Sequence, residues 1–223
     1  MQRLKVFILI LVTFLLIAGV LFVSAGSIAL PMFWAYLMMM AALTIIVLIA
    51  VYPRMPEIMQ EKKRSGDGQQ DKLTGPVLLA LFLVHWSIAG IDVGRYHWSS
   101  SVPAVLQITG LMIAGCGFSL LAWSIIINRF YSSRVNVQID RGQEVITSGP
   151  YRFVRHPGYI GWILFMLSGG IALGSWLSGL PMFLLAILIV RRTYIEDKML
   201  QNDLKGYKEY TFLVRFRLIP GLW

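Results

Sequence analysis

The stretch GPYRFVRHPGYIGW, residues 149–162, places two arginines and a histidine directly before an apolar run. A residue that precedes proline avoids the helical region, and proline favours the first position of a helix. We therefore expect an extended His156 and a helix that begins at Pro157. A helix start has unpaired N–H groups and partial positive charge, which suit a carboxylate or a phosphate. Gly158 and Tyr159 would supply these donors, although a basic membrane flank with a helix-starting proline explains the same residues.

A second polar stretch, RRTYIEDKML at 191–200, follows the last apolar run. Its Arg192 and Glu196 are four residues apart, so they share one face of a helix. In isolation this spacing also fits a surface ion pair of small energetic value. Because both stretches are present, we favour a cytoplasmic site for a charged ligand over a basic membrane flank and a surface ion pair.

The elements that must position these residues are membrane helices. The chain of 223 residues is 57% hydrophobic and only 14% charged, with a mean hydropathy of +0.69, which excludes an ordinary soluble domain. We predict an all-α, polytopic bundle of transmembrane helices with five to six apolar segments. The last two segments are short and separated only by GSW, so they should form a helical hairpin. The six segments are 4–24, 31–52, 75–94, 104–127, 158–174 and 176–190.

The distribution of positive charge predicts the orientation of these helices. If the N-terminus is cytoplasmic and the segments alternate, all Lys and Arg except Arg95 fall on the cytoplasmic side. Both termini and the charged site would then be cytoplasmic. After residue 190 we expect a C-terminal amphipathic helix on the membrane surface or at the end of the bundle. Its apolar positions are Met199, Leu200, Leu204, Tyr207, Phe212 and Val214.

Several other functions are disfavoured by the composition. The formal net charge of +9 is spread along one membrane face without a base-stacking platform, so we expect no nucleic acid partner. The single Cys116 gives no disulfide or thiol cluster, and we predict no metal site. His85 lies within an apolar segment, where it could face a substrate cavity or simply pack with one hydrogen bond. A local charge cluster near the outer surface is expected from Asp92, Arg95 and His97.

At this point the sequence resembles a known family. Residues from about 125 to 223 are similar to the catalytic half of the isoprenylcysteine carboxyl methyltransferase and phospholipid methyltransferase group, which are integral membrane enzymes. The matching stretches are VITSGPYRFVRHPGYIGW, RRTYIEDKML and YKEYTFLVRFRLIP, and their order and spacing carry the resemblance. We therefore divide the chain into N-terminal transmembrane helices at 1–127 and a catalytic half at 128–223.

The resemblance implies S-adenosylmethionine as cofactor, and it implies which residues hold this cofactor. Arg192 matches the position that faces the substrate in this family, and His156 is the second residue with an implied catalytic role. Asp197 stands where the family has a second glutamate. The implied cofactor-binding residues are Gln138, Gln143, Glu144, Val145, Ile146, Tyr151, His156, Pro157, Gly158, Tyr159 and Glu196.

The methyl acceptor is expected to be lipid-borne or a small hydrophobic molecule that enters from the membrane lipids. A carboxylate acceptor is already nucleophilic, and Arg192 could orient it by paired hydrogen bonds. An amine or thiol acceptor, as in phospholipid N-methylation, would need His156 or Glu196 as a base. A non-catalytic scaffold or transporter is the remaining alternative. The sequence does not indicate an oligomeric state.

Overall fold

The computed structural model describes residues 2–54, 74–99, 102–132 and 137–223. Within these ranges the regular structure is helical and no strand occurs, which confirms the all-α prediction. Four helices are long and apolar enough to cross a membrane, and Pro157–Leu173 is a shorter apolar helix. The polytopic membrane bundle predicted from composition is therefore confirmed.

The long helices follow the predicted apolar segments. They are α1 (Gln2–Ala25), α2 (Pro31–Val51), α4 (Thr74–Ile91), α5 (Ala104–Ile127), α6 (Pro157–Leu173) and α7 (Gly179–Asp203), followed by the short α8 (Tyr207–Leu213). Single helical turns cover η1 (Tyr52–Arg54), η3 (Asp92–Tyr96), η4 (Ile139–Arg141) and η5 (Gly149–Arg152).

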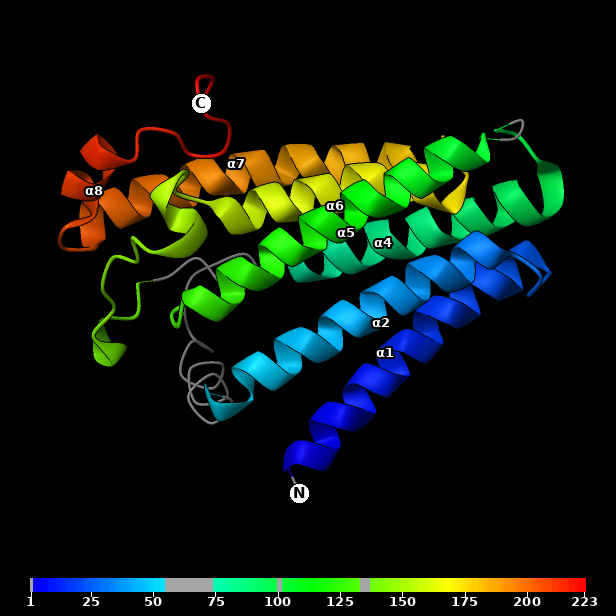
Figure 1. Ribbon diagram of the computed structural model, residues 1–223, viewed down its shortest axis with the longest axis horizontal. Helices are drawn as coiled ribbons and strands as arrows, with labels where there is room; N and C mark the ends of the chain where they lie inside the picture. Colours follow the sequence, from blue (N-terminus) through cyan, green and yellow to red (C-terminus); the bar gives the residue numbers. More distant parts are fainter. Residues whose placement is uncertain (1, 55–73, 100–101, 133–136) are drawn as a thin grey trace.

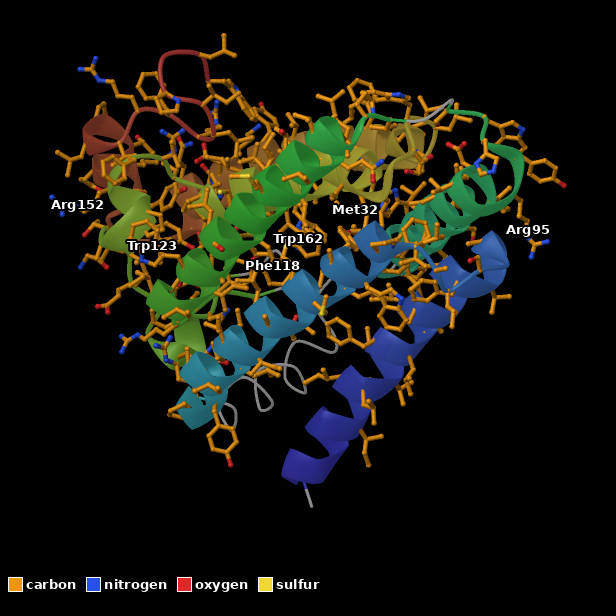
Figure 2. All side chains as sticks on the ribbon, turned by 45° about the vertical axis from the view of Figure 1, so that its right-hand side comes forward. Met32, Arg95, Phe118, Trp123, Arg152 and Trp162 are labelled. Atoms are coloured by element: carbon orange, nitrogen blue, oxygen red, sulfur yellow. The ribbon has the colours of Figure 1, made fainter. Side chains whose placement is uncertain are left out.

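The helices α4, α5, α6 and α7 lie side by side along the long axis, while α1 and α2 diverge from them as an antiparallel pair (Figure 1). At one end of the bundle α5 ends, α6 begins, α7 ends and α8 packs across them. We call this end the site end. Figure 2 places Arg152 at the site end and Arg95 at the opposite end, as expected if these two arginines lie on different membrane sides.

The closest packing in the bundle is between α5 and α6, and glycines make it possible. A Cβ atom on Gly161 would lie 2.5 Å from the carbonyl oxygen of Gly117, and one on Gly110 would lie 2.7 Å from the backbone nitrogen of Ala172. Membrane helices use small residues in this way because close approach of two backbones gains dispersion contacts that lipid cannot provide. The α5–α6 pair is thus a rigid support for the turn between them.

The predicted hairpin of the last two apolar segments is present as α6 and α7. Helix α6 ends at Leu173, where Gly174 adopts a left-handed conformation with φ of 84°. The apolar segment predicted at 176–190 is only the first part of a longer helix, because α7 begins at Gly179 and continues to Asp203. The second polar stretch therefore extends from a helix with one buried face, which fixes its orientation.

The predicted C-terminal amphipathic helix is divided between two elements. Its apolar positions fall on the last turns of α7, on the connection and on α8, since the chain breaks at Gly206 with a φ of 84°. Most of them form a second small core with Tyr210 at the site end, rather than a face on the membrane surface. Phe212 is 79% exposed and lies outside this core. The members of this core are Leu200, Leu204, Tyr207, Tyr210 and Val214.

At the opposite end, the predicted charge cluster is not formed. Asp92 is fully buried and accepts hydrogen bonds from the backbone N–H of Ser99 at 2.8 Å and from the hydroxyls of Ser99 and Ser175. Arg95 instead donates to the carbonyl oxygens of Val23 and Ser24 at the end of α1. Asp92 therefore ties two loops together.

His85 in α4 is buried, and its Nδ1 lies 2.7 Å from the carbonyl oxygen of Ser178. A carbonyl only accepts, so Nδ1 carries the proton. This contact holds α4 against the start of α7. It fits the packing interpretation of His85, which lies away from the cavity described below.

Candidate active site

The turn before α6 has the conformation that its prolines and glycines predict. Gly149 has a φ of 57°, and a Cβ there would lie 3.0 Å from the side chain of Ile127 at the end of α5. His156 is non-helical with φ of −128° and ψ of 60°, and Pro157 is the first residue of α6. The backbone N–H groups of Arg155 and His156 donate to the carbonyl oxygens of Phe216 and Arg217 at 3.0 Å. The C-terminal segment thus supports the turn from behind.

A cavity lies in front of this turn, and the open space within its lining, including solvent at its mouth, is about 780 Å³. It is enclosed by the end of α5, the chain before η5, the start of α6, the end of α7 and α8, all at the site end (Figure 1). The predicted residues that line it are Gln143, Glu144, Val145, Ile146, Tyr151, His156, Gly158, Tyr159 and Glu196.

Two of the residues implied as cofactor-binding do not line this cavity. The side chain of Gln138 is buried and engaged in its own loop, since Nε2 donates to the carbonyl oxygen of Phe130 at 2.8 Å and Oε1 accepts from Arg141 at 2.6 Å. Pro157 is buried behind the turn as the first residue of α6. Glu144 does line the cavity, but its carboxylate is exposed and pairs with Arg129 at 2.8 Å.

The N–H groups at the start of α6 are only partly available. The N–H of Tyr159 donates to the carbonyl oxygen of His156 at 3.1 Å, so the expectation that it is a free donor is wrong. Gly158 faces the cavity and lies against Tyr131, because a Cβ on Gly158 would be 3.1 Å from the Tyr131 ring. The absence of a side chain at Gly158 keeps this wall of the cavity open.

Asp197 organises the back of the site. Its carboxylate is fully buried and accepts from Nε of Arg155 at 2.8 Å and from Nε of Arg217 at 2.8 Å. It also contacts Nε2 of His156 at 3.2 Å and the hydroxyl of Tyr207 at 3.1 Å. Burial alone would raise the pKa of Asp197, but the hydrogen bonds from His156, Arg155 and Arg217 hold it well below its usual range.

Arg155 belongs to the same network. Its guanidinium pairs with Asp197 and donates to the carbonyl oxygens of Val214 and Arg215 at 2.8 Å. Its charge is therefore compensated within the protein. Arg152 remains exposed at the surface. Asp197, where the family has glutamate, serves to hold the turn and the C-terminal segment together.

His156 is held between two carboxylates. Its Nε2 faces Asp197, and its Nδ1 lies 4.0 Å from Oε1 of Glu196. A carboxylate only accepts, so Nε2 is assigned as protonated, and Nδ1 faces the side of Glu196. Asp197 therefore fixes both the tautomer and the orientation of the imidazole.

Glu196, Tyr159 and Arg192 meet at one hydroxyl group. The Tyr159 hydroxyl donates to Oε2 of Glu196 in a short hydrogen bond, and it accepts from Nε of Arg192 at 2.9 Å. Arg192 is not among the residues that line the cavity. The predicted Arg192–Glu196 pair is thus connected through a residue from another helix.

Several residues around the cavity were not identified from the sequence. They are polar or aromatic groups at the end of α5 and on α8 that carry no motif of their own, although the spacing of Tyr207 and Tyr210 does place them on one helical face. Burial and the charge of Glu196 raise the pKa of Tyr131 to about 12. Burial also raises the pKa values of Tyr151, Tyr207 and Tyr210, so these phenols stay neutral. The unidentified residues include Asn128, Phe130, Tyr131, Arg155, Met199, Leu200, Leu204, Tyr207 and Tyr210.

The part of the chain that the structure describes contains no group of three or more His, Cys, Asp or Glu residues that could hold a metal ion.

A search of curated proteins finds no match to the chain. Residues 106–202 match the model of the isoprenylcysteine carboxyl methyltransferase (ICMT) family. The matched region covers nearly all of α5, the turn, α6 and α7 as far as the second polar stretch. Over residues 106–202 the chain is therefore similar to the isoprenylcysteine carboxyl methyltransferase family, and its apolar helices are those of a membrane protein.

Proposed function

We propose that the protein is an S-adenosylmethionine-dependent methyltransferase that methylates the carboxylate of a lipid-borne or small hydrophobic acceptor. The observation that carries this proposal is the convergence of the implied residues on one cavity. Residues 143–146, the turn at 151–159 and Glu196 are distant in sequence, yet they surround the same space. Among the described residues, all that line this cavity fall between Asn128 and Tyr210, within the catalytic half proposed from the sequence.

The residues of the cavity fit the chemical groups of the cofactor. The carboxylate of Glu196 would accept hydrogen bonds from an ammonium or from ribose hydroxyls. The N–H of Gly158, at the positive end of α6, would bind a carboxylate. The aromatic and apolar wall that includes Phe130, Tyr151 and Leu200 would suit an adenine ring. When bound, S-adenosylmethionine supplies a methyl group that its sulfonium makes electrophilic.

Arg192 is the residue that would bind the acceptor. Its planar guanidinium suits a carboxylate, which needs no base to become nucleophilic. The protein then has to align the acceptor and exclude water rather than transfer a proton. His156 would keep the cavity wall in place, because Asp197 fixes its orientation. An amine acceptor would require Nδ1 of His156 or the Glu196 carboxylate to remove a proton.

The same proposal includes the orientation of the site. The distribution of Lys and Arg outside the apolar segments supports a cytoplasmic position for the cavity and both termini. The cofactor would then enter from the cytoplasm, and the acceptor would enter from the bilayer.

Calorimetric titration with S-adenosylhomocysteine tests this function directly. Wild-type protein in detergent should show saturable binding, and Glu196→Ala should weaken it by about 10- to 100-fold, because a hydrogen bond to a charged group is worth roughly 1.5–3 kcal/mol. Glu209→Ala is the matched control, since Glu209 is exposed on α8 outside the cavity. Well-folded wild-type protein that binds no S-adenosylhomocysteine would refute the cofactor assignment.

The acceptor is tested by turnover. N-acetyl-S-farnesylcysteine is an isoprenylated cysteine with a free carboxylate, and incubation with labelled S-adenosylmethionine should give a base-labile methyl ester. Arg192→Ala should lower turnover by about 10-fold or more and leave the affinity for S-adenosylhomocysteine within about twofold. A base-stable methylamine formed from membrane phospholipid would instead support N-methylation.

A further inference from the structure

The hydroxyl of Tyr159 joins the residue proposed to bind the cofactor to the residue proposed to bind the acceptor. A carboxylate can only accept and a guanidinium can only donate. The hydroxyl proton must therefore point to Glu196, and the hydroxyl oxygen must accept from Nε of Arg192, 2.9 Å away. Both directions are determined by chemistry.

The supports of these three side chains make the link rigid. Tyr159 lies in the first turn of α6, directly after the turn that Asp197 holds. Its ring stacks on the His156 imidazole with centroids 5.8 Å apart and planes inclined by 24°. Arg192 and Glu196 lie one turn apart on the same face of α7. The three side chains therefore have little conformational freedom. What can change is the set of partners that the Tyr159 hydroxyl contacts.

We propose that Tyr159 is a positioning residue that orients Arg192 towards the carboxylate of the acceptor and couples acceptor binding to the occupancy of Glu196. This inference rests on the proposed function. The family resemblance implies only that Tyr159 contacts the cofactor. The bridge to Arg192 adds an effect on the second substrate.

The direction of the coupling follows from the shared carboxylate. A hydrogen bond to Glu196 polarises the Tyr159 hydroxyl and strengthens its attraction for Arg192. When donors of the cofactor also bind Glu196, its charge is distributed over more hydrogen bonds, and the hold of Tyr159 on Arg192 weakens. The Arg192 guanidinium, still in place beside Tyr159, then binds the acceptor carboxylate more strongly. Cofactor binding should therefore increase the affinity for a carboxylate acceptor, and the reverse effect must be equal.

The test measures binding of N-acetyl-S-farnesylcysteine with and without saturating S-adenosylhomocysteine. In the wild type, S-adenosylhomocysteine should lower the Kd of this probe by about fivefold or more, the usual range of such couplings. In Tyr159→Phe the stacked ring is kept and the hydroxyl is lost, so the two Kd values should agree within about twofold. The Kd of S-adenosylhomocysteine alone should change by less than about tenfold. A purely structural role of Tyr159 would not abolish the coupling selectively.

Tyr194→Phe is the matched control, because Tyr194 lies between Arg192 and Glu196 in the sequence but is 49% exposed. It should retain the wild-type coupling. The proposal is overturned if Tyr159→Phe keeps the wild-type ratio of Kd values, or if wild-type protein shows no coupling. A probe that fails to bind while S-adenosylhomocysteine binds would overturn the coupling and the carboxylate acceptor but not the cofactor site. Absence of S-adenosylhomocysteine binding would instead refute the proposed function itself.

Discussion

Two fully buried aspartates lie at opposite ends of the bundle, and they have different kinds of partner. Asp197, at the site end, is bound by two arginines and a histidine, and by the neutral side chains of Tyr207 and Gln201. Asp92, at the opposite end, accepts from a backbone N–H and from the hydroxyls of Ser99 and Ser175. Both carboxylates are therefore well hydrogen-bonded, but among the described residues only the Asp197 network contains cations.

The difference in partners reflects what each carboxylate has to hold. Around Asp92, two short connections close over the ends of α4 and α6, and neutral donors are sufficient for that. Around Asp197, the turn before α6, the end of α7 and the C-terminal segment must meet beside a cavity. Cations bind several groups at once and resist displacement, because leaving a buried charge unpaired is costly. The site end thus gains a fixed wall against which a ligand can bind.

Replacing Asp197 should have the largest effect. Asp197→Ala leaves the Arg155 guanidinium buried without its counter-charge, which typically costs about 3–5 kcal/mol. The apparent thermal midpoint in detergent should fall by roughly 10 °C, and binding of S-adenosylhomocysteine should be lost because His156 is no longer oriented. Thermal unfolding followed by intrinsic fluorescence measures the first effect, and calorimetry measures the second. Retained stability together with retained binding would show that Asp197 does not organise the site.

Replacing Asp92 should have a smaller effect that is confined to stability. Asp92→Ala leaves neutral donors of Ser99 and Ser175 without their acceptor, at a cost of about 1–3 kcal/mol for each unsatisfied buried group that water cannot reach. The thermal midpoint should fall less than in Asp197→Ala. The Kd of S-adenosylhomocysteine should stay within about twofold, since the cavity lies at the other end. A large loss of binding in folded Asp92→Ala would mean that the two ends are coupled through the helices.

The fold was largely predictable because membrane insertion imposes simple length rules. Uncharged runs such as 104–127 correctly predicted the helices, and Pro157 correctly predicted the start of α6. The continuation of α7 through the polar stretch to Asp203 was not predicted, because hydropathy falls there while the helical backbone continues.

The site was predictable only where a motif carried it. Tyr151, His156, Gly158, Tyr159 and Glu196 were predicted to belong to one site, and they line one cavity. Asp197 was not understood, because a consecutive residue on a helix points about 100° away from its neighbour, towards partners that are distant in sequence. Arg217 and Tyr207 bind it from the C-terminal segment. Contacts of this kind arise from tertiary packing and have no local pattern.

The smallest expected effect is the contribution of Asp197 to the pH dependence of the stability of the protein. The hydrogen bonds from its partners hold the pKa of Asp197 in the folded protein well below its ordinary value of 3.8. The unfolded chain therefore binds this proton more readily, so the stabilisation is complete above the ordinary pKa and is lost as the pH falls below it. Between pH 5 and pH 3.5 the wild type should lose roughly 0.6 kcal/mol from this group.

Asp197→Asn has no titratable group at this position. Comparing its thermal midpoint with that of the wild type therefore isolates the contribution of Asp197 from those of all other carboxylates. The midpoint of the wild type should fall by about 1–2 °C more than that of Asp197→Asn between these pH values. Equal shifts would mean that the carboxylate of Asp197 ionises alike in the folded and unfolded states. The cationic network would then not stabilise the charged form, and the contrast with Asp92 would reduce to a difference in hydrogen-bond geometry.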